Sequence, residues 1–346
     1  MSTCLTVNLY LPDWVHAGSN IAHTKLTQRG RHMPELVAAD AGALIPLRGV
    51  ALTARWIAHE RWLESRRLEG ERLFEDPLAR ALGGEDGERY SEGIKANAAD
   101  GPGDPSWPEW HRNWVAVRTA EIDARCAAAL DAENRSEAAT ITQVVNLGAG
   151  LDARAFRGLG RRANGPSFAG CDVFEVDFED VLRAKALTAA ALGVAPRAAR
   201  YEAVAADVTD ALEWTTAVRA AGFDPARPAL FLGEGLLCYL PARRARAVLE
   251  AAAELAAPGS VWIGDWHTPE SHFSAALGAT RRAVAKSFEH AGWGAELRSF
   301  GEDEALRRGR FPEHKAPFPG LGIVHARRGE TKHTTGAVVA GSCSLA

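Results

Sequence analysis

The sequence predicts an α/β fold in which helices cover both faces of a doubly wound, Rossmann-like parallel sheet, preceded by a helical cap. Two observations lead to this prediction. After Thr140, apolar runs of strand length alternate with amphipathic stretches of helical length, and the first apolar run ends in the string Gly148-Ala149-Gly150. Buried parallel strands read as continuous apolar runs, and a glycine-rich turn between strand and helix is typical of a βαβ unit.

The chain is predicted to have four parts. Residues 1–48 show no sustained hydrophobic period and contain several helix breakers, so we expect a poorly structured arm. Residues 49–135 are predicted to form an N-terminal helical cap, and residues 136–330 the α/β domain. The small and polar residues 331–346 are expected to form a flexible tail.

The helical cap is predicted from apolar residues that recur near helical spacing. This pattern runs from Val50 to Leu82 and returns over Trp110–Leu130. Within the first stretch, Asp76 is suited to cap a short second helix that opens at Pro77. Gly83–Pro108 is rich in Gly, Pro and Asp, and it is predicted to be a long loop.

The α/β domain is predicted from five apolar runs and the helical stretches between them. The predicted strands are Gln143–Leu147, Val173–Val176, Ala203–Ala206, Ala229–Leu232 and Val261–Gly264. The predicted helices are Ala153–Leu159, Glu179–Leu192, Ala211–Ala221, Ala242–Ala256 and Ser271–Ala291. Ala295–Phe300 and Leu321–Ala326 are expected to close the edge of the sheet as an antiparallel pair.

Composition and charge exclude several classes of protein. Hydrophobic residues make up 47% and charged residues 24% of the 346 residues, which is ordinary for a globular chain. The net charge of −4 offers no electrostatic footprint for nucleic acid or an anionic membrane, and no apolar run approaches bilayer-spanning length. The five cysteines are scattered without a Cys-x-x-Cys pair, which argues against a disulfide framework or a zinc site.

The compartment expected from the cysteine usage is the reducing cytoplasm. The N-terminal run Leu5–Val15 is interrupted by Asn8, Pro12 and Asp13, so it does not read as a secretory signal. Organelle targeting by residues 1–48 is the alternative, because that stretch has only three acidic residues.

The glycine-rich turn is the first candidate binding feature. Gly148 and Gly150 allow the backbone to turn sharply, and the absence of a Cβ lets a ligand approach closely. The string also satisfies the permissive dinucleotide fingerprint, with Ala153 in its last position. By itself it predicts either a nucleoside site or simply a tight strand-to-helix turn.

Acidic residues follow three further predicted strands, at the edge where the carboxyl ends of parallel strands meet. Asp177 could accept both hydroxyl protons of a ribose, and Glu175 is a second candidate. Asp207 could accept a hydrogen bond from an adenine amine, and Glu234 could meet an ammonium group. The alternatives are helix capping by Asp177 and Asp207 and a packed structural role for Glu234.

These features occur within longer blocks that follow one another in order: GVALTARWIAHERWLES, LFEDPLARALGG, VRTAEIDARC, NLGAGLDARAFR, FEVDFEDVLRAKA, AADVTD and AAGFDPARPALFLGEGLLCYLP. Together the blocks resemble the leucine carboxyl methyltransferase family over about Val50–Gly264. The N-terminal blocks look more like the bacterial small-molecule branch of this family than the branch that acts on phosphatase tails. The resemblance implies a class I methyltransferase fold with S-adenosyl-L-methionine as the cofactor.

The resemblance also implies a role for each matching residue. Arg118 would pair with the methionine carboxylate of the cofactor, a task that suits a bidentate guanidinium. The other implied cofactor contacts are Gly148 and Gly150 along the methionyl moiety, Asp152 in the same turn, Asp177 at the ribose, Asp207 with Val208 at the adenine, and Glu234 beside the methionyl end. Ala153 departs from the family, where threonine is frequent. The arm before Val50 and the residues after about Trp266 match poorly, which leaves the substrate open.

Methyl transfer from a sulfonium requires alignment of acceptor, methyl and sulfur, together with exclusion of water. A carboxylate acceptor is already ionised at neutral pH, whereas a phenol or alcohol needs a general base. The candidate bases are His267 and Tyr239, and the alternative for each is a packing role. An aromatic stripe at helical spacing is expected to be core or to wall an apolar acceptor pocket: Trp107, Trp110 and Trp114, with His111 between them.

The sequence therefore predicts an S-adenosylmethionine-dependent O-methyltransferase that acts on a carboxylate or hydroxyl of a small, polyketide-like metabolite. Carboxyl methylation of a protein C-terminus is an alternative that uses the same cofactor site. A third hypothesis is an NAD-dependent oxidoreductase, and a fourth is a non-catalytic binding module that retains the fold. No metal, nucleic acid or membrane partner is expected, and the oligomeric state is left open.

Overall fold

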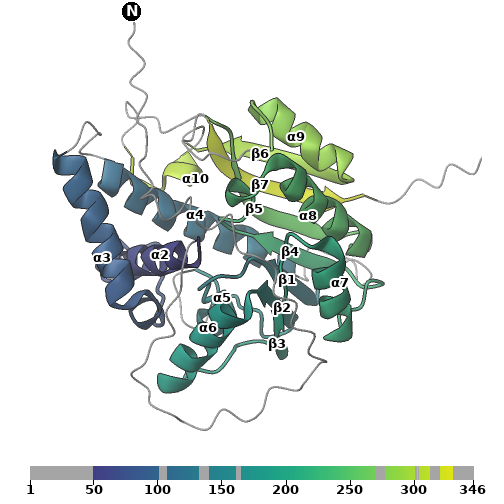
Figure 1. Cartoon of the computed structure of the whole chain (residues 1–346), viewed down its shortest axis with the longest axis horizontal. Helices are drawn as coiled ribbons and strands as arrows, with labels where there is room; N and C mark the ends of the chain where they lie inside the picture. The colour runs from purple at the N-terminus through teal and green to yellow at the C-terminus, as the bar shows by residue number, and fades with distance from the viewer. Residues whose placement is uncertain are drawn as a thin grey trace, which may run out of the picture.

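The computed structural model describes residues 50–100, 107–131, 140–160, 165–269, 277–300, 302, 304–311 and 320–329. In these ranges a seven-stranded sheet carries helices on both of its faces, with further helices packed at one side (Figure 1). The predicted arm, residues 1–48, and the predicted tail, residues 331–346, lie outside the described residues. None of the helices in the described ranges combines the length and the apolar character needed to cross a membrane.

The sheet has the strand order β3-β2-β1-β4-β5-β7-β6. Strands β1 to β5 are parallel, whereas β7 runs antiparallel to both of its neighbours, β5 and β6. The strands are β1 Gln143–Leu147, β2 Asp172–Asp177, β3 Arg200–Ala205, β4 Ala229–Gly233, β5 Val261–His267, β6 Trp293–Ser299 and β7 Leu321–Arg328. All five predicted parallel strands and the predicted antiparallel edge pair are confirmed. The largest differences are that β3 begins three residues earlier than predicted, at Arg200, and that β5 continues past Gly264 to include Asp265 and His267.

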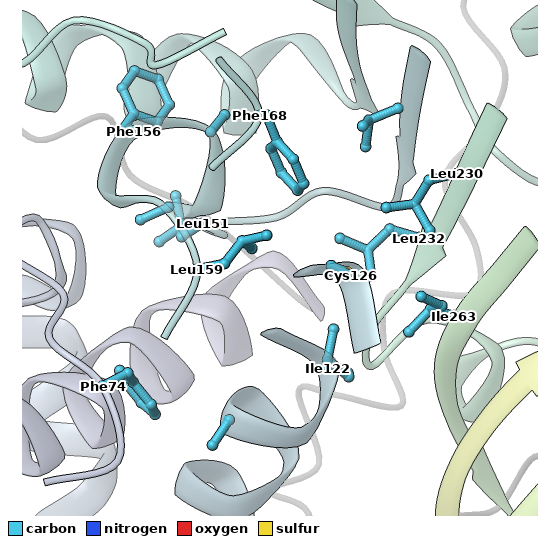
Figure 2. Packing of buried hydrophobic residues seen from close by; sticks show 14 of the residues in the cluster. Phe74, Ile122, Cys126, Leu151, Phe156, Leu159, Phe168, Leu230, Leu232 and Ile263 are labelled. Carbon is cyan, nitrogen blue, oxygen red and sulfur yellow. The ribbon is translucent and has the colours of Figure 1, made fainter. Parts of the chain in front are cut away.

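Helices form a layer on each face of the sheet (Figure 1). One face is covered by α4 (Trp107–Leu130), α5 (Arg154–Arg157) and α6 (Glu179–Ala191). The other face is covered by α7 (Ala211–Ala220), α8 (Ala242–Leu255) and α9 (Arg281–His290). Figure 2 shows part of the first interface, where Ile122 and Cys126 of α4 lie near Leu232 and Ile263 of the sheet.

The last predicted helix, Ser271–Ala291, is shorter than expected. Helix α9 begins after Thr280, whose side chain caps it by accepting a hydrogen bond from Ala283 N, and residues 270–276 lie outside the described residues. Two further short helices are the 3₁₀ helix η4 (Leu237–Tyr239) and α10 (Glu304–Arg307).

The range predicted as the helical cap, residues 49–135, contains α2 (Val50–Ser65), α3 (Ala79–Asp100) and α4. Helices α2 and α3 pack together and against α4, which itself covers the sheet, so the name cap is used below for α2 and α3. The prediction of a long loop over Gly83–Pro108 is wrong, because α3 continues to Asp100 across a kink at Gly84. Residues 101–106, which fall within the predicted loop, lie outside the described residues.

The reason for this error is the role of the glycines in α3. A Cβ on Gly87 would lie 2.4 Å from the carbonyl oxygen of Arg55, and a Cβ on Gly83 would lie 3.0 Å from the backbone nitrogen of His59. Both partners belong to α2, so glycine allows the two helices to approach closely. Glycines that are typical of a loop are needed here for a contact between two helices.

The aromatic stripe on α4 belongs to the core. Trp114 is buried and packs edge-on against Phe300 at a ring-centroid distance of 4.6 Å, and Trp110 contacts the same ring. His111 faces the cap instead and stacks on a tryptophan of α2 at 4.1 Å, and burial there lowers its pKa to about 3. The core interpretation is confirmed for these residues, and the side chain of Trp107 lies outside the described residues.

Candidate functional site

The candidate site lies where the order of strands reverses. The chain adds β2 and β3 on one side of β1 and then crosses to β4 on the other side. In open α/β sheets, ligands bind in the crevice at the carboxyl ends of the strands that flank such a switch point. Gly148 directly follows β1 and Glu234 directly follows β4, so two predicted site residues lie at this position.

The turn after β1 requires both of its glycines. Gly148 and Gly150 have φ angles of +60° and +50°, which L side chains rarely adopt. A Cβ on Gly148 would also lie 2.8 Å from Leu236 Cδ1, in the segment that follows β4. The two segments that flank the switch point therefore pack directly against each other, with the end of the Leu236 side chain on Gly148.

Hydrogen bonds tie this turn to the end of β2. Ala149 N donates to the carbonyl oxygen of Val176 at 3.1 Å, and Gly150 N donates to Asp177 Oδ2 at 2.7 Å. Asp177 Oδ1 accepts from Phe178 N, also at 2.7 Å. Burial raises the pKa of Asp177, and these two backbone N–H groups oppose the shift. Because a carboxylate oxygen accepts more than one hydrogen bond, Asp177 retains capacity for hydroxyl groups beside the turn.

The helix caps that the sequence offered as alternatives are formed by other residues. The N-cap of α6 is Phe178, which makes no side-chain cap bond, and the N-cap of α7 is Asp210. Asp207 makes a local turn by accepting a hydrogen bond from Thr209 N at 2.8 Å, and the neighbouring Val208 is buried in the core. Asp177 is thus the last residue of β2 and Asp207 follows β3, and neither residue is the N-cap of the next helix.

Glu175 lies within β2, before the carboxyl end of the strand. Its carboxylate is buried and accepts hydrogen bonds from Lys185 Nζ and from the hydroxyl of Tyr201, both at 2.6 Å. Burial raises the pKa of Glu175 against the opposing charge of Lys185. Glu175 Oε2 is thus engaged in a buried contact with Lys185 and Tyr201, and the role of Glu175 as a ribose ligand stays a prediction.

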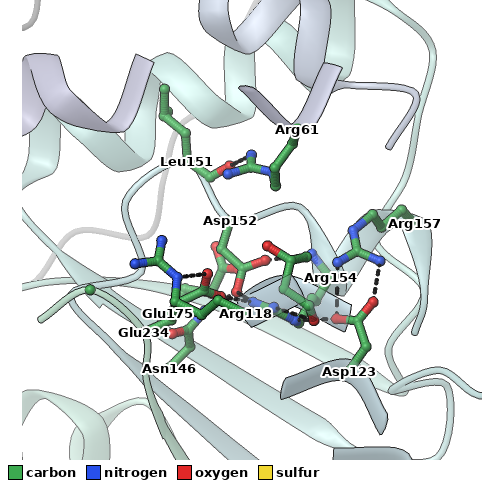
Figure 3. Close-up of polar contacts among 12 residues, drawn as sticks. Arg61, Arg118, Asp123, Asn146, Leu151, Asp152, Arg154, Arg157, Glu175 and Glu234 are labelled. Atoms are coloured by element: carbon green, nitrogen blue, oxygen red, sulfur yellow. Dashed lines mark hydrogen bonds and ion pairs between the residues drawn. The ribbon is translucent and has the colours of Figure 1, made fainter. Parts of the chain in front are cut away.

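A buried network of charged side chains lies beside the turn (Figure 3). Glu234 accepts hydrogen bonds from Arg118 Nε at 2.9 Å and from an Arg154 guanidinium nitrogen at 2.6 Å. Arg118 also donates to Asp265 Oδ2 at 3.2 Å. Burial by itself lowers the pKa of Arg118, but Glu234 and Asp265 outweigh it and raise the pKa. Arg118 and Glu234, predicted independently as site residues, are therefore in direct contact.

Arg154 is a central residue of this network that sequence analysis misses. Its side chain is 2% exposed, and its guanidinium donates to Asp123 at 2.6 Å and to Asp152 at 2.8 Å in addition to Glu234. Burial raises the pKa of Asp152, but Arg154 outweighs it and lowers the pKa. Asp152 accepts a further bond from Asn146, the residue before the end of β1. The signal in the sequence that could have identified Arg154 is its position two residues after Asp152, directly after the glycine turn. The side chains of these two residues are in contact.

Of the two candidate bases, His267 is buried and Tyr239 is partly exposed. The His267 side chain is 1% exposed, and its Nε2 lies 3.2 Å from Asp265 Oδ2. Burial raises the pKa of Asp265, but the hydrogen bond with His267 and the charge of Arg118 outweigh it and lower the pKa to about 2. Burial raises the pKa of Tyr239, so its phenol is neutral at physiological pH and poorly suited as a base.

Within the described ranges, no group of three or more His, Cys, Asp or Glu side chains is arranged to hold a metal ion.

Comparison with known sequences identifies similar proteins. Residues 54–253 match the profile of the leucine carboxyl methyltransferase family. A protein of Mycobacterium avium (strain 104), described as an S-adenosyl-L-methionine-dependent methyltransferase, is 39% identical over 193 residues, which cover 56% of this chain and 58% of that protein. The match thus spans less than two thirds of that relative. A protein of Mycobacterium sp. (strain KMS) with the same description is 34% identical over 311 residues, covering 81% of this chain and 96% of that protein.

Comparison of this fold with solved structures identifies a similar protein. A DUF574 family protein from Streptomyces avermitilis superposes with a TM-score of 0.50 and 15% sequence identity, covering 80% of this chain and 97% of that chain. At this level of identity the similarity concerns the fold alone.

Proposed function

Because this chain belongs to the leucine carboxyl methyltransferase family, a family of S-adenosyl-L-methionine-dependent methyltransferases, we propose that it transfers the cofactor's methyl group to an oxygen of a small metabolite. The predicted family, class I fold, enzyme class and cofactor are confirmed at the level of the family. The family assignment also removes the oxidoreductase hypothesis. The observation that supports a catalytic cofactor site in this chain is the contact between Arg118 and Glu234 at the switch point.

The chemistry of the residues fits the cofactor part by part. S-adenosylmethionine has a zwitterionic amino-acid end, a ribose diol and an adenine ring, and it supplies an activated methyl group. Arg118 would bind the carboxylate and Glu234 the ammonium, because a guanidinium and a carboxylate lie side by side there. Asp177 would accept the ribose hydroxyl groups, and Asp207 with Val208 would contact the adenine. Gly148 and Gly150, beside Asp152, would let the methionyl chain pass close to the backbone.

The acceptor we propose is a carboxylate of a small, polyketide-like molecule. A carboxylate is ionised at neutral pH and needs no general base, whereas an alcohol or phenol does. In the described part of the chain, the enclosed His267 and the neutral Tyr239 are both poorly placed for that task. A hydroxyl acceptor is the second candidate, since the Asp265–His267 pair has the composition of a base held by a carboxylate.

The cofactor assignment predicts a specific pattern of binding. In isothermal titration calorimetry, S-adenosylmethionine and S-adenosylhomocysteine are expected to bind with dissociation constants in the micromolar range or below, and NAD is expected not to bind. The physical reason is that NAD lacks the amino-acid group that Arg118 and Glu234 would receive. Binding of NAD without either sulfur nucleoside would overturn the proposed function.

The acceptor assignment predicts the stability of the product. With methyl-labelled cofactor and a panel of small aromatic acids and their hydroxy analogues, the label is expected to be released as methanol by mild base, as for an ester. Label that survives the base would identify an ether and the hydroxyl alternative. Peptides ending in a free leucine carboxylate serve as the comparison for protein C-terminal methylation, and their preferential labelling would contradict a small-molecule acceptor.

A further inference from the structure

Arg61, in the C-terminal half of α2, reaches from the helical cap to the turn that follows β1. Its guanidinium donates to the carbonyl oxygen of Leu151 at 2.6 Å, directly after Gly150 (Figure 3). The same side chain donates from Nε to Asp76 Oδ2 at 2.9 Å, and both side chains are buried. A cation from the cap therefore holds a peptide group of the candidate cofactor turn.

A second cation, which belongs to the α/β domain, also holds the turn. Lys185 of α6 donates from Nζ to the carbonyl oxygen of Asp152 at 3.0 Å, and Glu175 anchors the same ammonium at 2.6 Å. Hydrogen bonds from charged donors are about twice as strong as neutral ones. Two consecutive carbonyl groups, those of Leu151 and Asp152, thus receive such bonds, one from the cap and one from the α/β domain.

Helix α2 also touches the turn through packing. A Cβ placed on Gly150 would lie 3.7 Å from the Cβ of Ala54, which is ordinary contact distance, so the first turns of α2 lie over the glycine. Ala54 and Arg61 are seven residues apart and so project from the same side of the helix. The cap therefore meets the turn at two points, one apolar and one charged.

We infer that Arg61 is a positioning residue that makes cofactor affinity depend on the docking of the cap helix α2. The inference rests on the proposed function. Without Arg61, the Leu151 carbonyl loses a charged donor and the turn is less ordered in the free protein. Cofactor binding must then order the turn, and the free energy of this ordering lowers the affinity. By linkage, a cofactor that binds the ordered turn must also stabilise the docked cap by the same free energy.

Calorimetry with S-adenosylhomocysteine tests the first half of this inference. Arg61→Gln is expected to weaken binding by about ten- to a hundredfold, the range for loss of a hydrogen bond from a charged donor. Arg61→Lys keeps a cation of similar reach and is expected to bind more tightly than the glutamine variant. The matched control is Arg80→Gln in α3, where the exposed guanidinium lies over Trp62, and it is expected to bind as the wild type does.

Hydrogen–deuterium exchange tests the coupling, which a purely local structural role of Arg61 would not change. Addition of S-adenosylhomocysteine is expected to slow amide exchange in residues 50–65 of the wild type, and to do so less in Arg61→Gln. Circular dichroism of the unliganded variants verifies folding, and Arg61→Lys provides the comparison if the glutamine variant unfolds. Failure of the wild type to bind either sulfur nucleoside would overturn the proposed function and this inference with it. Equal affinity and equal protection in wild type and both variants would overturn the role of Arg61 alone.

Discussion

Replacement of Arg154 by methionine is expected to lower the free energy of unfolding by about 3–5 kcal/mol, the range observed when one partner of a buried ion pair is removed. The guanidinium is 2% exposed and contacts carboxylates from three parts of the chain, Asp123, Asp152 and Glu234. Methionine fills a similar volume without any donor, so these carboxylates would lose their shared partner in a dry environment. Urea unfolding followed by tryptophan fluorescence at pH 7 measures the change.

The control for this prediction is Arg244→Met on α8. Arg244 is exposed and donates one hydrogen bond to the carbonyl oxygen of Thr209, so its loss is expected to stay within about 0.5 kcal/mol. Two remaining contacts limit the effect at Arg154, because Arg157 still binds Asp123 and Arg118 still binds Glu234. A loss below about 1 kcal/mol for Arg154→Met would show that the network does not stabilise the fold.

Arg118→Ala is expected to weaken the binding of S-adenosylhomocysteine by about 100-fold while leaving the affinity for adenosine unchanged. This magnitude corresponds to the loss of a hydrogen-bonded pair between a guanidinium and a carboxylate, about 2–3 kcal/mol. The fold is expected to survive, since Glu234 retains Arg154 and Asp265 retains His267. Calorimetry with the two ligands separates contacts to the amino-acid end from contacts to the nucleoside.

Arg125→Ala provides the matched control for Arg118. It removes an arginine from the same helix, α4, one that pairs with Glu121 at 3.9 Å and takes no part in the network beside the turn. Its affinity for both ligands is expected to equal that of the wild type. An equal loss of adenosine and S-adenosylhomocysteine binding in Arg118→Ala would show that Arg118 does not contact the methionine carboxylate.

Strands β1, β4 and β5 were predictable because they are buried along their whole length, and burial of this kind leaves a continuous apolar run in the sequence. Gln143–Leu147 is predicted to the residue. Helix α3 could not be predicted in the same way. Gly83 and Gly87 read as loop residues, yet they are needed because α2 approaches within a distance that excludes a Cβ. The sequence pattern around a glycine does not reveal whether a turn or a neighbouring helix requires it.

The position of the candidate site was also predictable from the sequence. The glycine turn follows β1, Asp177 ends β2, and Asp207 and Glu234 follow β3 and β4. The carboxyl ends of these strands share one edge because the strands are parallel. Arg118 was reached only through the family resemblance, because nothing in the local pattern of α4 distinguishes it from a surface arginine.

The sequence by itself determined the fold class, the edge of the sheet at which the candidate site residues lie, and, through the family, the cofactor. Only the tertiary structure decided which charges meet there. Arg118 contacts Glu234 across 116 positions, and Arg61 contacts Leu151 across 90. Local propensity and periodicity concern residues within a few turns of one another, whereas these contacts depend on how the cap packs on the sheet. The glycine turn can be read in the sequence, but the cations that hold it, Arg61 and Lys185, become apparent only in the folded chain.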